Sequence, residues 1–312
     1  MSVLLLAEHD NGKLSPATAR LVAAASQLGP VDLLVVAEEP AAIAEAASTL
    51  SNVRKVLVAK GPETADSLAS TLERCAKSYQ FVSANASTVG KDVIPRLAAK
   101  LDIQPVTDIV AIAAPNRFTR PIYAGNALET VTDPQPLHLL TFRASAFRPV
   151  AAGAAAPVET LGNSVTSVAR LLAAHRTESD IPDLSTAQIV IGGGVSVGSA
   201  AGFQLIEKLG KTLGAAVGAT RAAVDAGYAP NDWQIGQTGK IIAPDLYIAI
   251  GISGALQHLA GIQGAKKIFA INTDPEAPLM KLADVALVGD LFEIIPQLIA
   301  ELEKLGVTKP TG

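Results

Sequence analysis

The sequence predicts an α/β protein with two domains, each built on a mostly parallel sheet, the C-terminal one doubly wound. Strand-length runs rich in Val, Ile and Leu alternate with Ala- and Leu-rich stretches of helical length. Hydrophobic residues make up 49% of the 312 residues, yet only 4% are aromatic. Parallel strands covered by helices on both faces have this composition. The length allows two ordinary domains, each with its own core.

The first half of the chain predicts alternating strands and helices. An apolar strand at 2–7 precedes a helix from about Ser15, where Ser-Pro suits an N-cap followed by proline at the first helical position. Further strands are expected at 31–37, 55–59 and 81–85, with helices from Pro40, over 64–78 and over 89–101. This alternation predicts parallel pairing. Strand-like pieces broken by Pro and Gly at 105–147 predict an antiparallel extension.

A linker is expected next, because residues 151–159 and 177–185 are small, polar or proline-containing. We therefore predict an N-terminal domain of residues 1–184, which includes the linker, and a C-terminal domain of residues 185–312. The second domain restarts the alternation, with strands at 187–194, 215–220, 245–251, 266–272 and 285–290, and helices over 201–213, from about Gly254 and over 291–304.

Composition excludes several classes of function. The net charge is −4 and no basic stripe is present, so no nucleic-acid partner is expected. Cys75 is the single cysteine, which excludes an intramolecular disulfide or a multi-thiolate metal site. No apolar run reaches the roughly 18 residues of a membrane-spanning helix, and the N-terminus opens directly into a strand. We expect no membrane insertion and a bacterial cytoplasmic location, with the mitochondrial matrix after leader removal as the alternative.

The predicted carboxyl ends of the second-domain strands are rich in Gly, Ser, Thr, Asn and Asp. In chain order the strands are followed by GGGVSVG, TRAAVDAG, GISGALQH, NTD and GDLF. Ligands of open α/β sheets bind at these ends. The sequence therefore predicts a ligand site there.

Two nucleotide-binding motifs fail on inspection. A dinucleotide fingerprint needs G-x-G-x-x-G, and Gly192 and Gly194 fit, but the third position is Val197. A Walker loop at GQTGK would need glycine at Gln234 and Ser or Thr at Ile241. A standard NAD site and a P-loop are both disfavoured.

A hydrolase site is also disfavoured. Ser253 stands in a GxSxA near-match to a nucleophile elbow, but the last histidine, His258, follows only five residues later. The remaining polar groups are the cation of Arg221, the imidazole of His258 and the amides of Gln237 and Gln257. We find no convergent carboxylate pair, metal-ligand spacing or nucleophile beside a base. Such a site suits a cofactor that carries the chemistry itself.

Long segments of the second half resemble electron transfer flavoprotein alpha subunits. The signature is LYIAIGISGALQHLAGIQGAKKIFAIN at 246–272, preceded by GAAVGATRAAVDAGYAPNDWQIGQTGKIIAP at 214–244. The likeness runs from about residue 210 to 300, and the opening LLLAEHDNGKL is similar as well. One departure is Val195, within GGGVSVG, where the family usually has Arg.

The resemblance implies a heterodimer of alpha with a beta subunit, FAD in the C-terminal domain of alpha, and AMP in beta. It implies an electron carrier, not an enzyme. The carrier would accept electrons from flavoprotein dehydrogenases, such as the acyl-CoA dehydrogenases of fatty acid beta-oxidation, and pass them to a membrane-associated quinone oxidoreductase. Domain motion would be needed, and we expect the linker at 177–185 to act as its hinge.

The resemblance also assigns roles to residues. Arg221 would lie against the isoalloxazine, His258 would approach its pyrimidine-side carbonyl, and Thr238 would place its hydroxyl near N5. A cation and a donor there stabilise negative charge on the ring, and the helix start after Gly254 suits phosphate. The other implied contacts are Thr220, Ile235, Gly236 and Gln237 at the flavin and ribityl region, Ser253, Gly254, Ala255, Leu256 and Gln257 at the ribityl-pyrophosphate, and Asn272, Asp290 and Leu291 at the adenosine half.

Two alternative functions remain open at this point. One is an FAD- or NAD-dependent oxidoreductase acting on a small substrate, for which His258 is the one acid-base candidate found. The other is a non-catalytic nucleotide-binding or interaction module with a vacant site.

Overall fold

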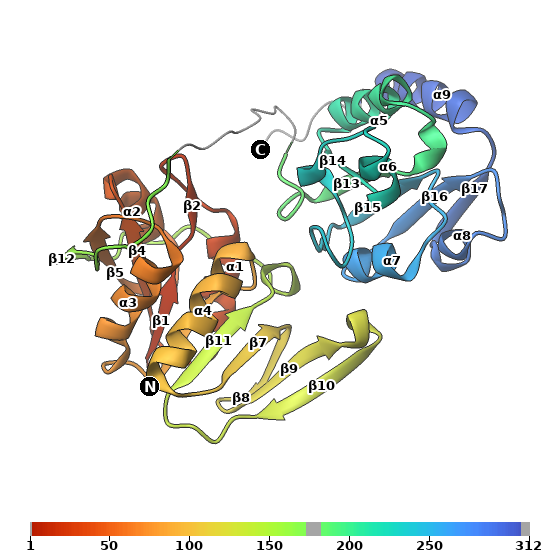
Figure 1. Ribbon diagram of the computed structural model, residues 1–312. Helices are drawn as coiled ribbons and strands as arrows, with labels where there is room; N and C mark the ends of the chain where they lie inside the picture. The colour runs from red at the N-terminus through yellow and green to blue at the C-terminus, as the bar shows by residue number, and fades with distance from the viewer. Residues whose placement is uncertain (1, 173–181, 307–312) are drawn as a thin grey trace. The chain divides into compact units, whose positions relative to one another are not determined.

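The computed structural model describes residues 2–172 and 182–306 (Figure 1). The chain divides into two compact units, the first containing the elements up to β12 and the second those from β13 onward. Residues 177–181 of the predicted linker and hinge lie outside the described residues. The domain ranges 1–184 and 185–312 stay a prediction.

The first unit is built on a seven-stranded parallel sheet in the order β12-β5-β4-β1-β6-β11-β7. Its strands are β1 (Val3–Leu6), β4 (Val31–Ala37), β5 (Val53–Lys60), β6 (Phe81–Asn85), β7 (Pro105–Ile109), β11 (His138–Phe142) and β12 (Val158–Asn163). A short antiparallel pair, β2 (His9–Asp10) with β3 (Lys13–Leu14), follows β1. The predicted parallel α/β architecture of this half is confirmed.

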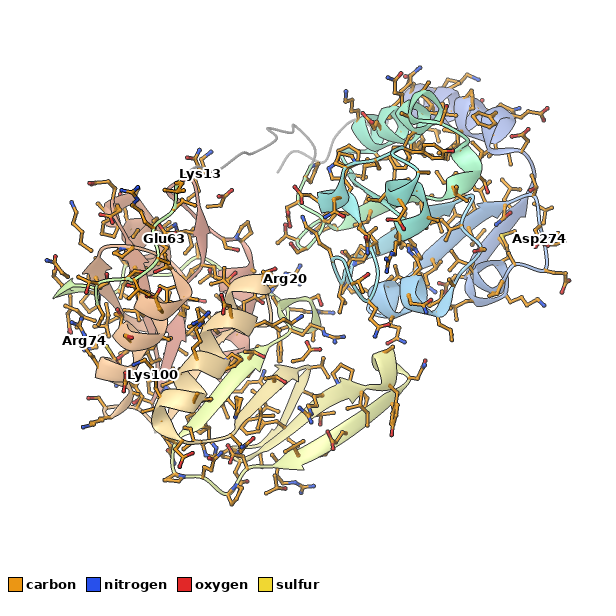
Figure 2. All side chains as sticks on the ribbon, in the orientation of Figure 1. Lys13, Arg20, Glu63, Arg74, Lys100 and Asp274 are labelled. Atoms are coloured by element: carbon orange, nitrogen blue, oxygen red, sulfur yellow. The ribbon has the colours of Figure 1, made fainter. Side chains whose placement is uncertain are left out.

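Helices cover both faces of this sheet (Figure 1). The helices α1 (Ala17–Ala25) and α2 (Ala41–Ser48) pack on one face, and α3 (Ala65–Ala76) and α4 (Thr88–Leu101) pack on the other. Successive strand residues point to opposite faces, so in β1 Val3 and Leu5 join the first core and Leu4 and Leu6 the second. At the surface, Lys100 of α4, labelled in Figure 2, is paired with Glu73 of α3 at 2.8 Å.

The predicted antiparallel extension at 105–147 is only partly right. An antiparallel sheet is present, formed by β8 (Ala111–Ala114), β9 (Arg117–Ile122) and β10 (Ala127–Thr132). However, β7 and β11 at the two ends of the segment are parallel members of the large sheet. All five residues of β11, HLLTF, are buried, and burial along the whole strand is typical of a parallel strand covered on both faces.

The interpretation of residues 151–159 as linker is wrong at their C-terminal end. Val158 and Glu159 begin β12, which pairs in parallel with β5 at the edge of the sheet, and Ala152 forms an isolated bridge with Leu50. All six residues of β12 are exposed. Without burial on either face, the strand has no apolar pattern by which sequence could identify it.

The second unit is a five-stranded, fully parallel sheet in the order β14-β13-β15-β16-β17. Numbered within the unit this is the order 2-1-3-4-5 of one of the two common doubly wound folds. The strands are β13 (Ile189–Gly193), β14 (Ala216–Ala219), β15 (Leu246–Ile250), β16 (Ile268–Asn272) and β17 (Val285–Val288). The predicted doubly wound sheet is confirmed.

Helices again cover both faces of the sheet (Figure 1). The helices α5 (Ala200–Leu213) and α9 (Leu291–Lys304) pack on one face, and α7 (Leu256–Ile262) and α8 (Pro278–Leu282) pack on the other. The short helix α6 (Arg221–Asp225) directly follows β14. Among the residues described, no helix combines the length and the apolarity needed to cross a membrane.

A buried carboxylate ties together two strands of the first unit and the turn after α3. Asp32 on β4 is fully buried, and Arg54 on β5 donates to both of its oxygens at 2.7 Å. The hydroxyl of Tyr79 donates to Oδ2 at 2.6 Å. A buried charge is tolerated when it is paired and hydrogen-bonded in this way.

We expect Arg54→Gln to lower the free energy of unfolding of the chain by about 2 kcal/mol, because it leaves the buried Asp32 carboxylate without its cation. Urea unfolding followed by circular dichroism measures the change. The control is Arg96→Gln. Arg96 forms an ion pair of 2.9 Å with Asp92, but both side chains are exposed, so this substitution should change the free energy of unfolding by less than about 0.5 kcal/mol. Equal effects of the two substitutions would contradict the role given to Asp32.

Candidate functional site

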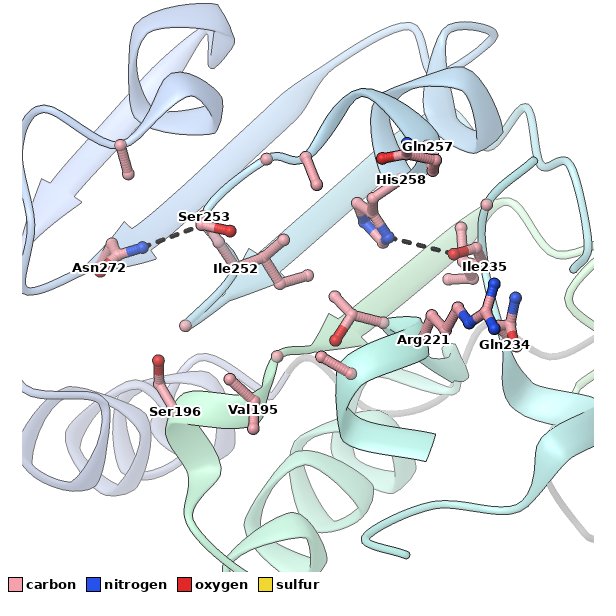
Figure 3. Close-up of a pocket in the computed structure, with 18 of the residues that line it drawn as sticks. Val195, Ser196, Arg221, Gln234, Ile235, Ile252, Ser253, Gln257, His258 and Asn272 are labelled. Carbon is pink, nitrogen blue, oxygen red and sulfur yellow. Dashed lines mark hydrogen bonds between the residues drawn. The ribbon is translucent and has the colours of Figure 1, made fainter. Parts of the chain in front are cut away.

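A pocket opens at the carboxyl ends of the strands of the second unit (Figure 3). Its volume of about 630 Å³ lies within the range of small-molecule and cofactor sites. Residues that follow β13, β14, β15 and β16 line it, together with the segment 234–238. The lining residues are Gly194, Val195, Ser196, Thr220, Arg221, Ala222, Asp225, Gln234, Ile235, Gly236, Gln237, Thr238, Gly251, Ile252, Ser253, Gly254, Ala255, Gln257, His258, Asn272, Thr273, Asp274 and Ala277.

The pocket lies at the point where the strand order reverses. The chain goes from β13 outward to β14 and then returns to β15 on the other side of β13. The loops after β13 and β15 therefore leave the sheet in diverging directions, which opens a crevice between them. The two loops touch at their base, where the N–H of Gly194 donates to the carbonyl of Ile250 at 2.9 Å.

Glycine is required where these two loops meet. A Cβ on Gly194 would lie 1.9 Å from the carbonyl oxygen of Gly251, a distance that no side chain can occupy. Gly251 itself has φ +62°, in the left-handed region. Gly194 is therefore required by the close approach of two backbones. The incomplete dinucleotide motif, with Val197 at its third position, is not needed to explain it.

The next wall of the pocket is the start of α6. Thr220 is the N-cap of this helix, and its hydroxyl accepts a hydrogen bond from the N–H of Ala223 at 3.3 Å. Arg221 follows and pairs with Asp225, one turn later, with Nε 3.3 Å from Oδ2. Both side chains of the pair are largely exposed, at 69% and 65%, so the guanidinium can also reach a bound ligand.

The segment 234–238 crosses the pocket and is held at both ends. The N–H of Ile235 donates to the carbonyl of Ala219 at 2.9 Å, and the N–H of Gln237 donates to the carbonyl of Gln257 at 2.8 Å. The side-chain amide of Gln234 donates to the hydroxyl oxygen of Thr238 at 2.8 Å. Because the Thr238 oxygen accepts this bond, its O–H hydrogen is available for donation to a ligand.

His258, on α7, is a buried and neutral residue of the pocket. Its Nδ1 lies 3.1 Å from the carbonyl oxygen of Ile235 (Figure 3). Its Nε2 lies 2.8 Å from the hydroxyl of Tyr247. Burial lowers the pKa of His258 to about 4, and burial also raises the pKa of Tyr247. Both ring nitrogens therefore have protein partners already.

Asn272, at the end of β16, connects two of the pocket loops. Its amide donates to the carbonyl of Ile252 at 3.1 Å (Figure 3). Its carbonyl oxygen accepts from the N–H of Asp274 at 3.1 Å. The loop after β15 and the loop after β16 are thereby fixed to one another.

Most residues selected from the sequence come together in this pocket. Three selected residues lie outside the lining: Leu256, which is 67% exposed, Asp290, which caps α9 through the N–H of Phe292, and Leu291, which packs in the core. The selected residues that line the pocket are Thr220, Arg221, Ile235, Gly236, Gln237, Thr238, Ser253, Gly254, Ala255, Gln257, His258 and Asn272.

The pocket also contains polar residues that the sequence analysis did not select. Ser196, Asp225, Thr273 and Asp274 belong to three of the strand-end sequences, GGGVSVG, TRAAVDAG and NTD, so strand-end position was a sufficient signal for them. Val195, the departure from the family pattern, also lines the pocket. Within residues 2–172 and 182–306, no cluster of three or more His, Cys, Asp or Glu side chains could hold a metal ion.

Fold and pocket together define a doubly wound α/β protein with a cofactor-sized cavity at the switch point of its sheet. Comparison with known families agrees with this class. The family described as "Electron transfer flavoprotein FAD-binding domain" matches residues 183–263, and the "Electron transfer flavoprotein domain" matches residues 3–165. FAD is thus the cofactor that the comparison supports.

Full-length relatives identify the family more closely. The electron transfer flavoprotein subunits alpha of Bradyrhizobium diazoefficiens and Paracoccus denitrificans are 48% and 46% identical, over 98% and 97% of this chain and 100% of theirs. A probable mitochondrial alpha subunit of Caenorhabditis elegans is 44% identical over 96% of this chain and 93% of its own. This chain belongs to the alpha subunits of the electron transfer flavoproteins, and its role is electron transfer.

We expect Gly194→Ala to destabilise the second unit by about 3 kcal/mol, because its Cβ would overlap the carbonyl oxygen of Gly251. Thermal unfolding of the full chain measures the effect. The control is Gly198→Asn. Gly198 has φ +75°, and a Cβ added at this position would have no other atom within 4 Å. Asn tolerates the left-handed region, so this variant should lose less than about 1 kcal/mol. A stable Gly194→Ala protein would refute the close approach.

We expect His258 to stay neutral down to a pH near 4, where its histidine NMR signals should titrate in the full chain. The unfolded chain binds this proton near pH 6.5. Acid therefore favours the unfolded state, and the contribution of His258 to the free energy of unfolding, roughly 3 kcal/mol, is present above pH 6.5 and is lost as the pH falls to 4. A titration midpoint near 6.5 would show that the ring is not buried.

Proposed function

We propose that this chain carries FAD in the pocket of its second unit and forms a heterodimer with a beta subunit. It accepts electrons from flavoprotein dehydrogenases, such as acyl-CoA dehydrogenases, and passes them to a membrane-associated quinone oxidoreductase. It makes and breaks no substrate bond, so it is an electron carrier rather than an enzyme. The carrying observation is that the match to an FAD-binding domain at 183–263 spans most of the pocket lining.

The residues of the pocket fit this cofactor. Arg221 offers a positive charge beside the cavity and Thr238 offers a hydroxyl hydrogen. The first N–H groups of α6 and α7 have no partners within their helices and suit the oxygens of a pyrophosphate. Buried Ile235 and Ile252 supply apolar surface for a planar ring. FAD supplies the redox chemistry, and the chain supplies binding, orientation and charge.

The individual contacts of the pocket follow the resemblance to the family. Arg221 would lie against the isoalloxazine, Thr238 would offer its hydroxyl near the flavin N5, and His258 would lie on the pyrimidine side. The remaining proposed contacts are Thr220, Ile235, Gly236 and Gln237 at the flavin and ribityl region, Ser253, Gly254, Ala255, Leu256 and Gln257 at the ribityl-pyrophosphate, and Asn272, Asp290 and Leu291 at the adenosine half.

The proposal extends to the rest of the assembly. Residues 1–184 form the domain that packs with the beta subunit, in which AMP is bound, and residues 185–312 form the FAD-binding domain. Movement of the second domain relative to the first lets the carrier reach different partners. A bacterial cytoplasm is the proposed location.

FAD binding is tested by co-expressing the chain with a beta subunit and recording the visible spectrum of the purified heterodimer. We expect the absorption of an oxidised flavin, at one FAD per alpha chain. A colourless heterodimer that stays colourless after incubation with excess FAD would overturn the proposal.

Arg221 and Asp225 should shift the midpoint potential of the bound flavin in opposite directions. Arg221→Gln removes a positive charge that stabilises reduced flavin and should lower the potential by about 40 mV, equivalent to roughly 1 kcal/mol for one electron. Asp225→Asn removes the carboxylate that partners Arg221 and should raise it. Spectroelectrochemical titration measures both, with Lys208→Gln on α5, outside the lining, as the control. Equal shifts in the three variants would exclude the assigned role of Arg221.

A further inference from the structure

Tyr247 lies beneath the pocket, and its role is not explained by the cofactor contacts above. It stands on β15 and is fully buried, at 0% exposure. Its hydroxyl is 2.8 Å from Nε2 of His258, and the two rings are 6.0 Å apart. A phenol buried in an apolar strand needs a partner for its hydroxyl, and His258 is that partner.

The direction of each hydrogen bond can be deduced. The carbonyl of Ile235 can only accept, so Nδ1 of His258 carries a hydrogen and donates to it. A neutral imidazole has one N–H, and therefore Nε2 has none and accepts from the hydroxyl of Tyr247. Burial keeps the proton on Tyr247 by raising its pKa, and burial lowers the pKa of His258. The result is a directed chain from Tyr247 through His258 to Ile235.

Gly192 provides the space for this arrangement. A Cβ at this position would lie 2.0 Å from the hydroxyl oxygen of Tyr247 and 2.7 Å from Cζ. Gly192 is on β13, directly beside β15, and so Tyr247 extends across the neighbouring strand at a point where this face of the strand has no side chain. The first glycine of GGGVSVG therefore serves the tyrosine and not a nucleotide.

The chain of hydrogen bonds also affects the shape of the pocket. Ile235 lies in the segment that crosses the pocket, and this segment is joined to α7 by two bonds, from His258 to Ile235 and from Gln237 to the carbonyl of Gln257. The state of the His258 ring thus determines one of the two links that position Thr238 and its neighbours.

We propose that Tyr247 is a positioning residue for His258. Its hydroxyl, accommodated by Gly192, donates to Nε2 and so holds the buried imidazole with Nδ1–H turned to Ile235, which sets the orientation and the protonation of the ring in this wall of the pocket. The part of the proposal that concerns the cofactor rests on the proposed function. The part that concerns the ring does not.

The other charged groups of the pocket do not replace Tyr247 in this role. Arg221 and Asp225 on α6 form an ion pair with one another, and Asp274 follows β16. The segment 234–238 contributes no titratable side chain. Of the titratable groups on the elements around His258, Tyr247 is the one hydrogen-bonded to the ring in the described part of the chain.

The first test is the protonation of His258, measured by nitrogen-15 NMR on the full chain with labelled histidine. We expect hydrogen on Nδ1 and none on Nε2 in the unsubstituted protein. Tyr247→Phe removes only the hydroxyl. It should therefore abolish the change in the nitrogen-15 chemical shift that the hydrogen bond causes at Nε2, and raise the pKa of His258 by up to about one unit. Hydrogen on Nε2 in the unsubstituted protein, or unchanged nitrogen shifts in Tyr247→Phe, would overturn the proposal.

The second test uses two adjacent glycines on opposite faces of β13. Gly192→Ala displaces the Tyr247 hydroxyl and should change the Nε2 signal as Tyr247→Phe does. Gly193→Ala is the matched control, because its Cβ would lie 2.5 Å from Cε2 of Phe203 on the other face. It should destabilise the protein without changing the His258 signals. The same change at Nε2 in both alanine variants would mean that general disturbance, not Tyr247, controls the ring.

The third test separates this proposal from the proposed function. In the heterodimer with FAD, lowering the pH from 8 to 5 should raise the midpoint potential more in Tyr247→Phe than in the unsubstituted protein, because more of its His258 becomes positively charged. Identical pH profiles, with FAD bound and the NMR change present, would refute the effect on the cofactor. Failure to bind FAD would refute the proposed function. The role of Tyr247 at the His258 ring would then be decided by the NMR experiment alone.

Discussion

The pocket depends on the contact between the backbones of Gly194 and Gly251. At this point β13 and β15 end side by side, and a side chain on Gly194 would collide with the carbonyl oxygen of Gly251. Because the two loops can touch at their base, they leave the sheet at once and in different directions. The cavity between them is a product of strand order and of this close approach, before any polar side chain is considered. The remaining loops of the pocket are attached to this pair, as Asn272 shows by its bond to Ile252.

The polar residues of the pocket are held by one another before a ligand arrives. Thr238 accepts from Gln234, Asn272 bonds to two loops, and both ring nitrogens of His258 are engaged. Side chains that are fixed in this way lose little further freedom on binding, and they present defined donors at defined places. The site therefore has a defined arrangement of polar groups before its cofactor binds.

Sequence predicted the second unit more completely than the first, for physical reasons. Its strands are apolar and followed by small polar residues, and all but the exposed edge strand β17 are largely buried, so both the sheet and the position of the pocket could be predicted. In the first unit β12 is exposed on both faces and gave no pattern, and β11 follows an antiparallel insertion that hid its parallel pairing. Tyr247 was missed because its partner and the space beside Gly192 come from other elements and exist only in the folded chain. The individual cofactor contacts and the domain boundary stay predictions.

The exposure of the Arg221–Asp225 pair has a consequence for how the cofactor is tuned. With both side chains about two-thirds in solvent, their fields are screened by dissolved ions over a Debye length of about 8 Å at physiological ionic strength. The buried His258 is shielded from such screening. Added salt should therefore weaken the influence of the ion pair on an electron in the pocket and leave the influence of the imidazole unchanged. Varying the salt concentration would separate the contribution of the Arg221–Asp225 pair from that of His258.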